Sequence, residues 1–211
     1  MIRAVVLISG RGSNLRALIE AHLPIAISAA ISNRPDAPGL DHARHSGIRA
    51  IALDHRGYPS REAFDQMLAA TIDEAGADLI ILAGYMRILT KGFVERYQGR
   101  LLNIHPSLLP AFPGLDTHAR ALAEGVKIHG CTVHFVTATL DHGPIIIQAA
   151  VPVLPNDTPD LLASRVLTEE HRIYPLAIKW FAEGRLVVSD GVVNIRGGGA
   201  SQSRCAMFEE T

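Results

Sequence analysis

The sequence predicts an α/β fold: a doubly wound, mostly parallel central sheet with helices on both faces. Its first half alternates continuous apolar runs of strand length with segments whose apolar residues recur at helical spacing. Continuous apolar runs are typical of strands buried on both faces, which belong to parallel sheets covered by helices. The chain has 211 residues and is 48% hydrophobic, which suits one globular domain, expected here over residues 1–195.

The elements of the first half follow in chain order. Strands are expected where the apolar runs are continuous, at residues 4–10, 25–33, 48–54 and 77–85. Helices are expected between them, at residues 13–23, 40–45 and 61–75. The first helix places Leu15, Leu18, Ile19 and His22 at helical spacing on one face. Ser60 is the expected N-cap of the third helix, and Gly76 lies just past its end.

The second half of the sequence has a different pattern of expected elements. The stretch "LLNIHPSLLP", from residue 101, begins as a buried strand, and residues 111–125 predict a loop followed by a helix. Residues 131–153 predict two strands around an Asp-His-Gly-Pro turn. A long helix is expected over roughly residues 158–183, and then a hairpin around Asp190 and Gly191. Residues 196–211 are low in apolar content, so we expect a flexible C-terminal tail.

Composition argues against several classes of protein. A formal net charge of -1 and a pI of about 6.8 give no basic footprint for nucleic acid. Cys131 and Cys205 do not make a disulfide framework, so we expect a reducing, cytoplasmic location. No apolar stretch reaches the roughly 18–20 residues of a spanning helix, and we expect no membrane partner. Scattered histidines without a ligand motif predict no metal.

The stretch "SGRGSN", residues 9–14, joins the first expected strand to the first expected helix. Glycine lets the backbone approach a ligand closely, and the free N–H groups of a helix N-terminus favour an anion. The third glycine of the dinucleotide fingerprint is missing, and no Gly-Lys-Ser/Thr follows as in a P-loop. The pattern by itself leaves a phosphate site and an ordinary tight turn about equally favoured.

A second candidate site lies where the buried run from residue 101 ends. Asn103 and His105 flank an apolar residue, so in an extended strand their side chains point the same way. Open parallel sheets bind ligands at the carboxyl ends of strands, and an Asn amide is a donor suited to an oxyanion. Asp141, in "TLDHGP", would orient His105 if the fold brings them together. The three would then form a transfer site at a carbonyl carbon, whereas a lone histidine is more often structural.

Taken in order, these residues resemble the formyltransferase family that uses 10-formyltetrahydrofolate. "NIHPSLLP" followed by "LDHGP" is similar to the catalytic signature of that family. Further stretches resemble its branch that formylates glycinamide ribonucleotide: "VVLISGRGSNL", "SREAFD", "LAGYMRIL", "HGCTVHFVT" and "EEHRIYPLAIKWFAEGRL". The resemblance covers roughly residues 2–187. It rests on the ordered set, because each motif alone is weak.

The resemblance implies a function and residue roles. The chain would transfer the formyl group of 10-formyltetrahydrofolate, its co-substrate, to the amine of 5-phosphoribosylglycinamide in purine (IMP) biosynthesis. The implied catalytic residues are Asn103, His105 and Asp141. The ribonucleotide would be held by Gly12, Ser13 and Asn14 at its phosphate and by Glu170 at its glycinamide end. The folate would be bound by Arg61, Met86, Arg87, Ile88, Leu89, Asn103, Thr137 and Asp141.

Some of these positions have a plainer explanation. Met86, Ile88 and Leu89 are apolar, and ordinary core packing would account for them. Glu169 and Glu170 would, without the resemblance, be assigned to a solvated helix face. Burial distinguishes these alternatives, because a core residue is enclosed and a solvated carboxylate is not.

The sequence departs from the family pattern at two positions, and other functions compete with the implied one. Asp116 stands where the family often has His, so an auxiliary histidine is missing at that position, although His118 remains nearby in the sequence. Arg11 stands where a small polar residue is common. The alternatives in the same family are a formyltetrahydrofolate hydrolase and a methionyl-tRNA formyltransferase. From another class, the chain would be a non-catalytic nucleotide-binding module. The expected partners are small-molecule substrates, in a monomer or a homodimer.

Overall fold

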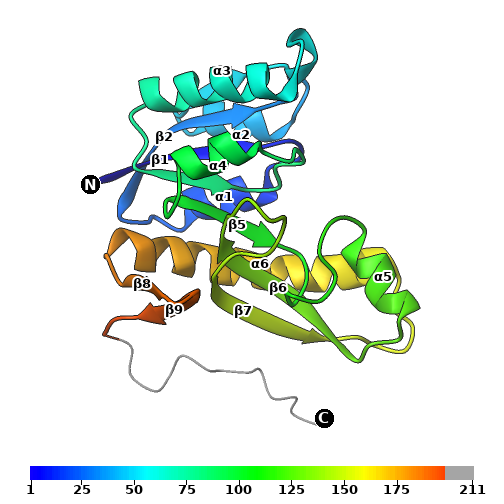
Figure 1. Ribbon diagram of the computed structural model, residues 1–211. Coiled ribbons are helices and arrows are strands. Elements are labelled where there is room, and N and C mark those ends of the chain that lie inside the picture. The colour runs from blue at the N-terminus through cyan, green and yellow to red at the C-terminus, as the bar shows by residue number, and fades with distance from the viewer. Residues whose placement is uncertain (198–211) are drawn as a thin grey trace. The chain divides into compact units, whose positions relative to one another are not determined.

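A computed structural model describes residues 1–197 of the chain (Figure 1). Seven strands form one mostly parallel sheet in the order β3-β2-β1-β4-β5-β6-β7, which confirms the predicted fold class. The strands are β1 (Ile2–Ile8), β2 (Ile25–Ser32), β3 (Arg49–Ala52), β4 (Leu79–Leu82), β5 (Leu101–His105), β6 (Ile128–Phe135) and β7 (Ile145–Pro152). The pairs among β1 to β5 are parallel, and β6 pairs antiparallel with β7.

The chain divides into two compact units. The first contains residues 1–103 and 135–140, and the second contains residues 104–134 and the chain from 141 onward. The single domain expected over residues 1–195 stays a prediction. The expected tail lies outside the described residues from position 198 onward.

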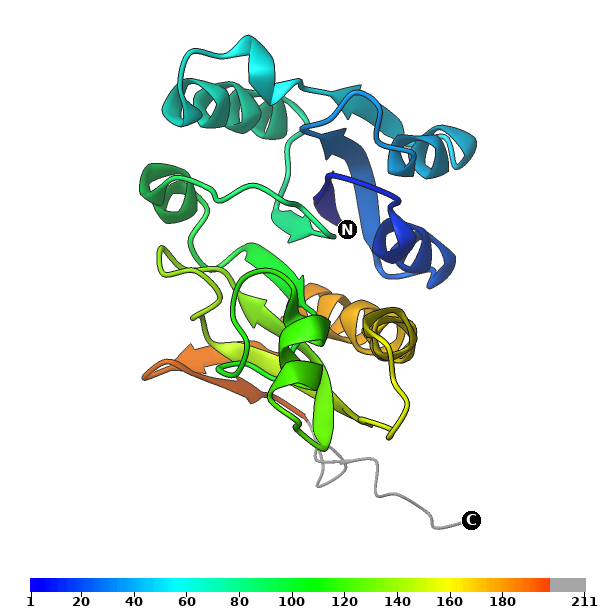
Figure 2. The same cartoon turned by 90° about the vertical axis from the view of Figure 1, so that its right-hand side faces the viewer.

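The first unit has helices on both faces of its strands (Figure 2). Helices α1 (Ser13–Glu20) and α2 (Gly39–His45) cover one face, and α3 (Arg61–Glu74) and α4 (Lys91–Arg96) cover the other. Because strand side chains alternate, Leu7 of β1 joins Phe64 of α3 and Tyr97 in one fully buried cluster. Burying a large apolar side chain contributes about 1.5–3 kcal/mol, so this layer is a main source of stability in the unit.

The predicted ends of α3 are confirmed. Ser60 has extended backbone, and its side chain accepts a hydrogen bond from the N–H of Ala63, a cap that typically stabilises by about 1 kcal/mol. Gly76 lies beyond the C-cap with a φ of 64°, a conformation that glycine adopts without strain. The short helix α4 was not predicted, since its six residues span less than two turns and show no clear periodicity.

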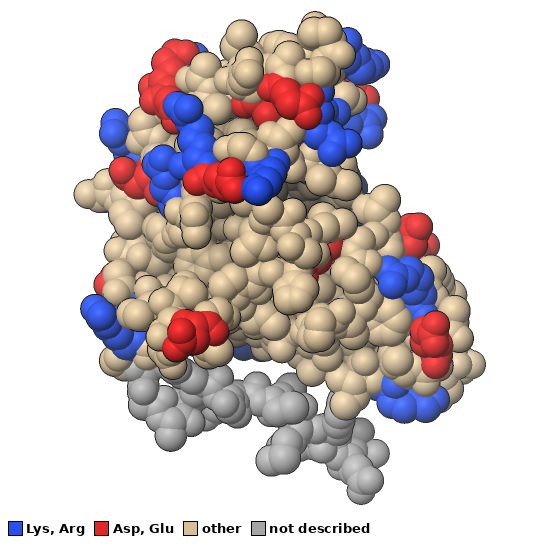
Figure 3. Space-filling view, in the orientation of Figure 1, with Lys and Arg blue, Asp and Glu red and all other residues tan. Residues whose placement is uncertain are grey.

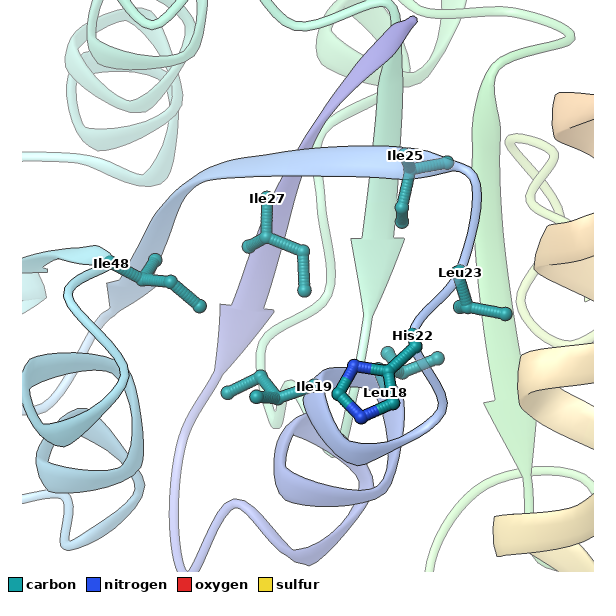
Figure 4. Close-up of a pocket in the computed structure, with 7 residues that line it drawn as sticks. All are labelled: Leu18, Ile19, His22, Leu23, Ile25, Ile27 and Ile48. Carbon is teal, nitrogen blue, oxygen red and sulfur yellow. The ribbon is translucent and has the colours of Figure 1, made fainter.

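The first helix is shorter than expected. It ends at Glu20, and His22 has a φ of 46°, so the prediction that His22 lies on the helix face is wrong. His22 instead lines a surface pocket of about 350 Å³ beside Leu18, Ile19, Leu23, Ile25, Ile27 and Ile48 (Figure 4). None of the predicted site residues lines this pocket.

The second unit contains the antiparallel pair β6 and β7, two helices and a hairpin. The loop and helix predicted within residues 111–125 are confirmed by α5 (Thr117–Ala123), and the long helix by α6 (Pro159–Ala182). Thr158 caps α6 by accepting the N–H of Leu161, and proline stands at its start, where no N–H is needed. The predicted hairpin is β8 (Leu186–Ser189) and β9 (Val192–Ile195), joined by Asp190 and Gly191, both with positive φ.

The surface shows no large field of one sign where it can be seen. On the face drawn in Figure 3, Lys and Arg are interspersed with Asp and Glu. Among residues 1–197, no helix is both long enough and apolar enough to cross a membrane.

Candidate functional site

His105 and Asp141 meet in the second unit. The ring Nδ1 of His105 lies 3.5 Å from Oδ2 of Asp141, and the two side chains are 7% and 9% exposed. His105 is the last residue of β5, whereas Asp141 lies in the loop between β6 and β7, with a φ of 49°. The juxtaposition that the sequence left open is therefore present. A buried imidazole beside a carboxylate is suited to holding and moving a proton.

A loop backbone fixes both members of this pair. The carbonyl oxygen of Phe112 lies 3.0 Å from Nε2 of His105, and the N–H of Gly114 donates to Oδ2 of Asp141 at 2.8 Å. A carbonyl only accepts, so Nε2 carries a hydrogen in this arrangement, and Nδ1 is left to face the carboxylate. The hydrogen bond at Nε2 thus sets the orientation of the ring, and Nδ1 attracts the carboxylate when it too carries a proton.

This loop is held by its own hydrogen bonds. Ser107 is fully buried, and its hydroxyl donates to the carbonyl of Ala111 at 2.6 Å. Thr132 of β6 donates to the carbonyl of Ser107 at 2.6 Å and accepts the N–H of Leu109 at 3.0 Å. The roles of Phe112 and Gly114 were not predicted, because both residues act through backbone atoms. The one visible signal was the Pro-Gly spacing in "AFPGL".

Two further histidines lie near the pair. His118 and His129 pack edge to face with ring centroids 5.2 Å apart, and His129 is almost fully buried. Burial lowers the pKa of His129 to about 4, with smaller contributions from His118 and His105. Burial, and then the nearby His105, also lowers the pKa of His118. Both rings are therefore mostly neutral at neutral pH.

Asn103 precedes His105 by two residues in β5. Because strand side chains alternate, the two occupy the same side of the strand, as the sequence indicated. Asn103 is half-buried, between the buried residues Leu102 and Ile104. The amide thus belongs to the residue two positions before the histidine in the same strand.

The turn predicted to bind phosphate opens α1 in the first unit. Gly12 is the N-cap residue with a φ of 74°, and Ser13 and Asn14 begin the helix. A Cβ at Gly12 would lie 2.6 Å from the Cα of Gly39, so both the backbone conformation and the packing require glycine. The first N–H groups of a helix have no partner within it, and together with the helix dipole they favour an anion.

The segment at residues 86–89 follows β4 in the same unit. Met86 is 67% exposed and Ile88 is 55% exposed, so the alternative that these two are core residues is wrong. Leu89 does pack against the buried cluster. The guanidinium of Arg87 lies 4.7 Å from the centre of the Phe64 ring. Exposed apolar side chains on a fixed segment form a surface suited to a flat organic ring.

Two more predicted folate residues lie in the first unit. Arg61 is the exposed first residue of α3. Thr137 follows β6, and its hydroxyl donates to the carbonyl of Thr139 at 3.2 Å.

Glu170 lies on α6 in the second unit and is only 8% exposed. The alternative of a solvated helix face is therefore wrong for Glu170. Glu169 is more exposed and pairs with Arg172, with 2.6 Å between Oε2 and a guanidinium nitrogen. Burial, and then the nearby Glu170, raises the pKa of the Cys131 thiol. The Glu170 carboxylate is therefore enclosed in the second unit rather than displayed on the outer face of α6.

In the part of the chain that the structure describes, no three His, Cys, Asp or Glu side chains gather in a way that could hold a metal ion.

The site thus combines a mostly parallel α/β sheet with a buried His–Asp pair at a strand end. The family model described as formyl transferase matches residues 2–178, and the chain belongs to this family. The match spans both compact units and includes every predicted site residue.

Several known proteins are similar to this chain over most of its length. Phosphoribosylglycinamide formyltransferase of Escherichia coli (strain K12) is 51% identical over 197 residues, which cover 92% of this chain and 93% of that one. The trifunctional purine biosynthetic protein adenosine-3 of Homo sapiens is 44% identical over 89% of this chain and 19% of its own length. The crystal structure of glycinamide ribonucleotide transformylase 1 from Symbiobacterium toebii matches with a TM-score of 0.90 and 54% identity, covering 92% of this chain and 94% of that one.

Proposed function

We propose that the protein transfers the formyl group of 10-formyltetrahydrofolate to the amine of 5-phosphoribosylglycinamide. The products are formylglycinamide ribonucleotide and tetrahydrofolate, in de novo purine biosynthesis. The observation that carries the proposal is the buried contact between His105 and Asp141 at the end of β5, in a chain 51% identical to a phosphoribosylglycinamide formyltransferase.

The chemistry needs no nucleophile from the protein. The amine of the ribonucleotide attacks the formyl carbon directly, and negative charge develops on the formyl oxygen. Asn103 and the protonated ring of His105 are the groups we assign to that charge, because preorganised donors stabilise a developing oxyanion most strongly. Holding both substrates in place supplies much of the remaining rate.

Proton transfer completes the reaction. The attacking nitrogen must lose a proton, and the folate N10 must gain one as its bond to the formyl carbon breaks. We assign these transfers to His105, directly or through an ordered water, with Asp141 orienting the ring. The carbonyl of Phe112 and the N–H of Gly114 support this role, since each holds one member of the pair at 3.0 Å and 2.8 Å.

Ribonucleotide binding is assigned to two regions. Gly12, Ser13 and Asn14 would bind the phosphate through the N-terminus of α1, supported by the positive φ of Gly12 and its close approach to Gly39. Glu170 would bind the glycinamide end, where a buried carboxylate suits an amine.

Folate binding is assigned by the family resemblance, with support from exposure. Met86 and Ile88 display apolar side chains that would pack on the folate ring system. When bound, the folate supplies the formyl group from its N10. The complete proposed set is Arg61, Met86, Arg87, Ile88, Leu89, Asn103, Thr137 and Asp141.

The test is a formyl-transfer assay with three acceptors. Phosphoribosylglycinamide, water and charged initiator tRNA are each supplied with 10-formyltetrahydrofolate, and release of tetrahydrofolate is followed. The proposal requires turnover with the ribonucleotide that exceeds turnover with water or tRNA by orders of magnitude. Turnover with water alone would instead assign a hydrolase, and no turnover would leave the non-catalytic binding module.

Location and assembly belong to the same proposal. We infer a cytoplasmic enzyme acting on small molecules, as a monomer or a homodimer. The buried free thiol of Cys131 supports a reducing compartment.

A further inference from the structure

The hydroxyl of Ser9 joins two segments of the first unit. Ser9 directly precedes the turn of residues 10–14 and is only 3% exposed. Its Oγ accepts the N–H of Met86 at 2.7 Å and donates to Oδ1 of Asn33 at 2.5 Å. Ser9 is the residue that follows β1, and its side chain therefore connects this position to the segments that follow β2 and β4.

Ser9 forms two hydrogen bonds with the segment after β4. The pairing of β1 with β4 ends at Leu7 and Leu82, and the backbone N–H of Ser9 then donates to the carbonyl of Gly84 at 3.1 Å. Further along this segment, the N–H of Met86 donates to the Ser9 side chain rather than to a backbone carbonyl. The Ser9 hydroxyl thus satisfies this N–H through a part-buried hydrogen bond between a side chain and the backbone.

The third connection is also held in place. Asn33 follows β2, is 4% exposed, and receives the Ser9 hydroxyl on its side-chain oxygen. Its carbonyl oxygen lies 2.9 Å from Nδ1 of His55, and its Nδ2 lies 3.4 Å from the same ring nitrogen. Asn33 is therefore a second anchor for the Ser9 hydroxyl and is itself held by His55.

We propose that Ser9 is a positioning residue that sets the segment at residues 84–86 against the turn at residues 10–14. This rests on the proposed function, in which that turn binds the ribonucleotide phosphate and residues 86–89 line the folate site. Ser9 touches neither reacting group. It acts through the backbone of Met86 and through its own place in the turn, so its loss disturbs the binding of both substrates.

The chain offers a matched control for the test. Ser32 is fully buried one residue before Asn33, and its hydroxyl bonds only locally, donating to the carbonyl of Arg34 at 2.8 Å and accepting its N–H at 3.0 Å. Ser32→Ala thus removes a buried hydroxyl from the same region without cutting a connection between strands.

The experiment compares Ser9→Ala with Ser32→Ala in the intact enzyme. Ser9→Ala should raise the KM of both substrates by about tenfold, the upper scale set by the loss of one hydrogen bond, and leave kcat less affected. Ser32→Ala should change either KM by less than about twofold. Ser9→Cys, whose thiol is a weaker donor and acceptor, should fall between wild type and Ser9→Ala and replaces it if Ser9→Ala does not fold.

Amide hydrogen exchange provides a readout independent of activity. The N–H of Met86 should exchange faster in Ser9→Ala than in wild type or Ser32→Ala. Unchanged KM values, a rise in only one of them, or unchanged Met86 exchange would each overturn the inference. A wild-type enzyme without formyl transfer would instead reject the proposed function, and the Met86 exchange would still decide whether Ser9 holds that segment.

Discussion

Gly114 donates its backbone N–H to the same carboxylate oxygen of Asp141 that faces His105. The N–H lies 2.8 Å from Oδ2, and Nδ1 of His105 lies 3.5 Å from it. The oxygen is shared between a fixed dipole and an ionisable ring, so the carboxylate cannot turn away without losing both contacts. This arrangement makes the pair a single unit, and its consequences are measurable.

His105→Asn and Asp141→Asn should each lower kcat by about 10²-fold or more, as expected on losing a general acid–base group or its orienting partner. The double variant should be far less impaired than the product of the two single effects, because the residues act together. Steady-state kinetics of the four proteins measure this coupling. Strictly multiplicative losses would mean that Asp141 does not act through His105.

Gly12→Ala should raise the KM of the ribonucleotide by at least tenfold and change the KM of the folate much less. The new Cβ would lie 2.6 Å from the Cα of Gly39 at a φ of 74°, so the turn must shift. Gly47→Ala is the matched control, because Gly47 has a φ of 69° but no atom within 4 Å of the added Cβ. Equal effects of the two variants on ribonucleotide KM would contradict the phosphate assignment.

Glu170→Gln should weaken ribonucleotide binding about tenfold and leave folate binding nearly intact. The substitution keeps the volume of the buried side chain and removes the charge that would attract an amine. Calorimetric titration of each ligand makes the measurement, with the neighbouring Glu169→Gln as the control that should change neither affinity. An unchanged ribonucleotide dissociation constant in Glu170→Gln would exclude this residue from the site.

Stability should fall on acidification in a window set by His129. Its ordinary pKa of 6.5 applies in the unfolded chain, and burial lowers the pKa to about 4 in the folded protein. Between those pH values the unfolded state binds more protons, so the free energy of unfolding decreases as pH falls from about 6.5 to about 4. Above that window the histidine is neutral in both states and the contribution is constant.

Denaturant unfolding at several pH values measures the slope, and His129→Gln should flatten it, because an amide does not titrate. The lowered pKa of His118 acts in the same direction, so some slope should remain. An identical slope in wild type and His129→Gln would show that another group controls the acid dependence.

Local chemistry made much of the fold predictable. The continuous apolar runs indicated the parallel strands, Ser60 and Gly76 marked the ends of α3, and Asp190 and Gly191 marked a hairpin. Each of these signals depends on a few neighbouring residues: periodicity, a capping side chain, or a backbone with positive φ. The helix α4 and the early end of α1 lay beyond such signals, since both are short and are decided by packing against the rest of the unit.

The candidate site was likewise predictable in part from local sequence and in part only from the folded structure. The sequence by itself determined which residues had the right chemistry: an amide and an imidazole on one side of β5, and a glycine turn before α1. Only the tertiary structure decided that Asp141 reaches His105, that Glu170 is buried, and that the backbone of Phe112 and Gly114 holds the pair. The physical reason is that contacts between distant segments depend on how the chain packs, and backbone donors and acceptors are the same at every residue.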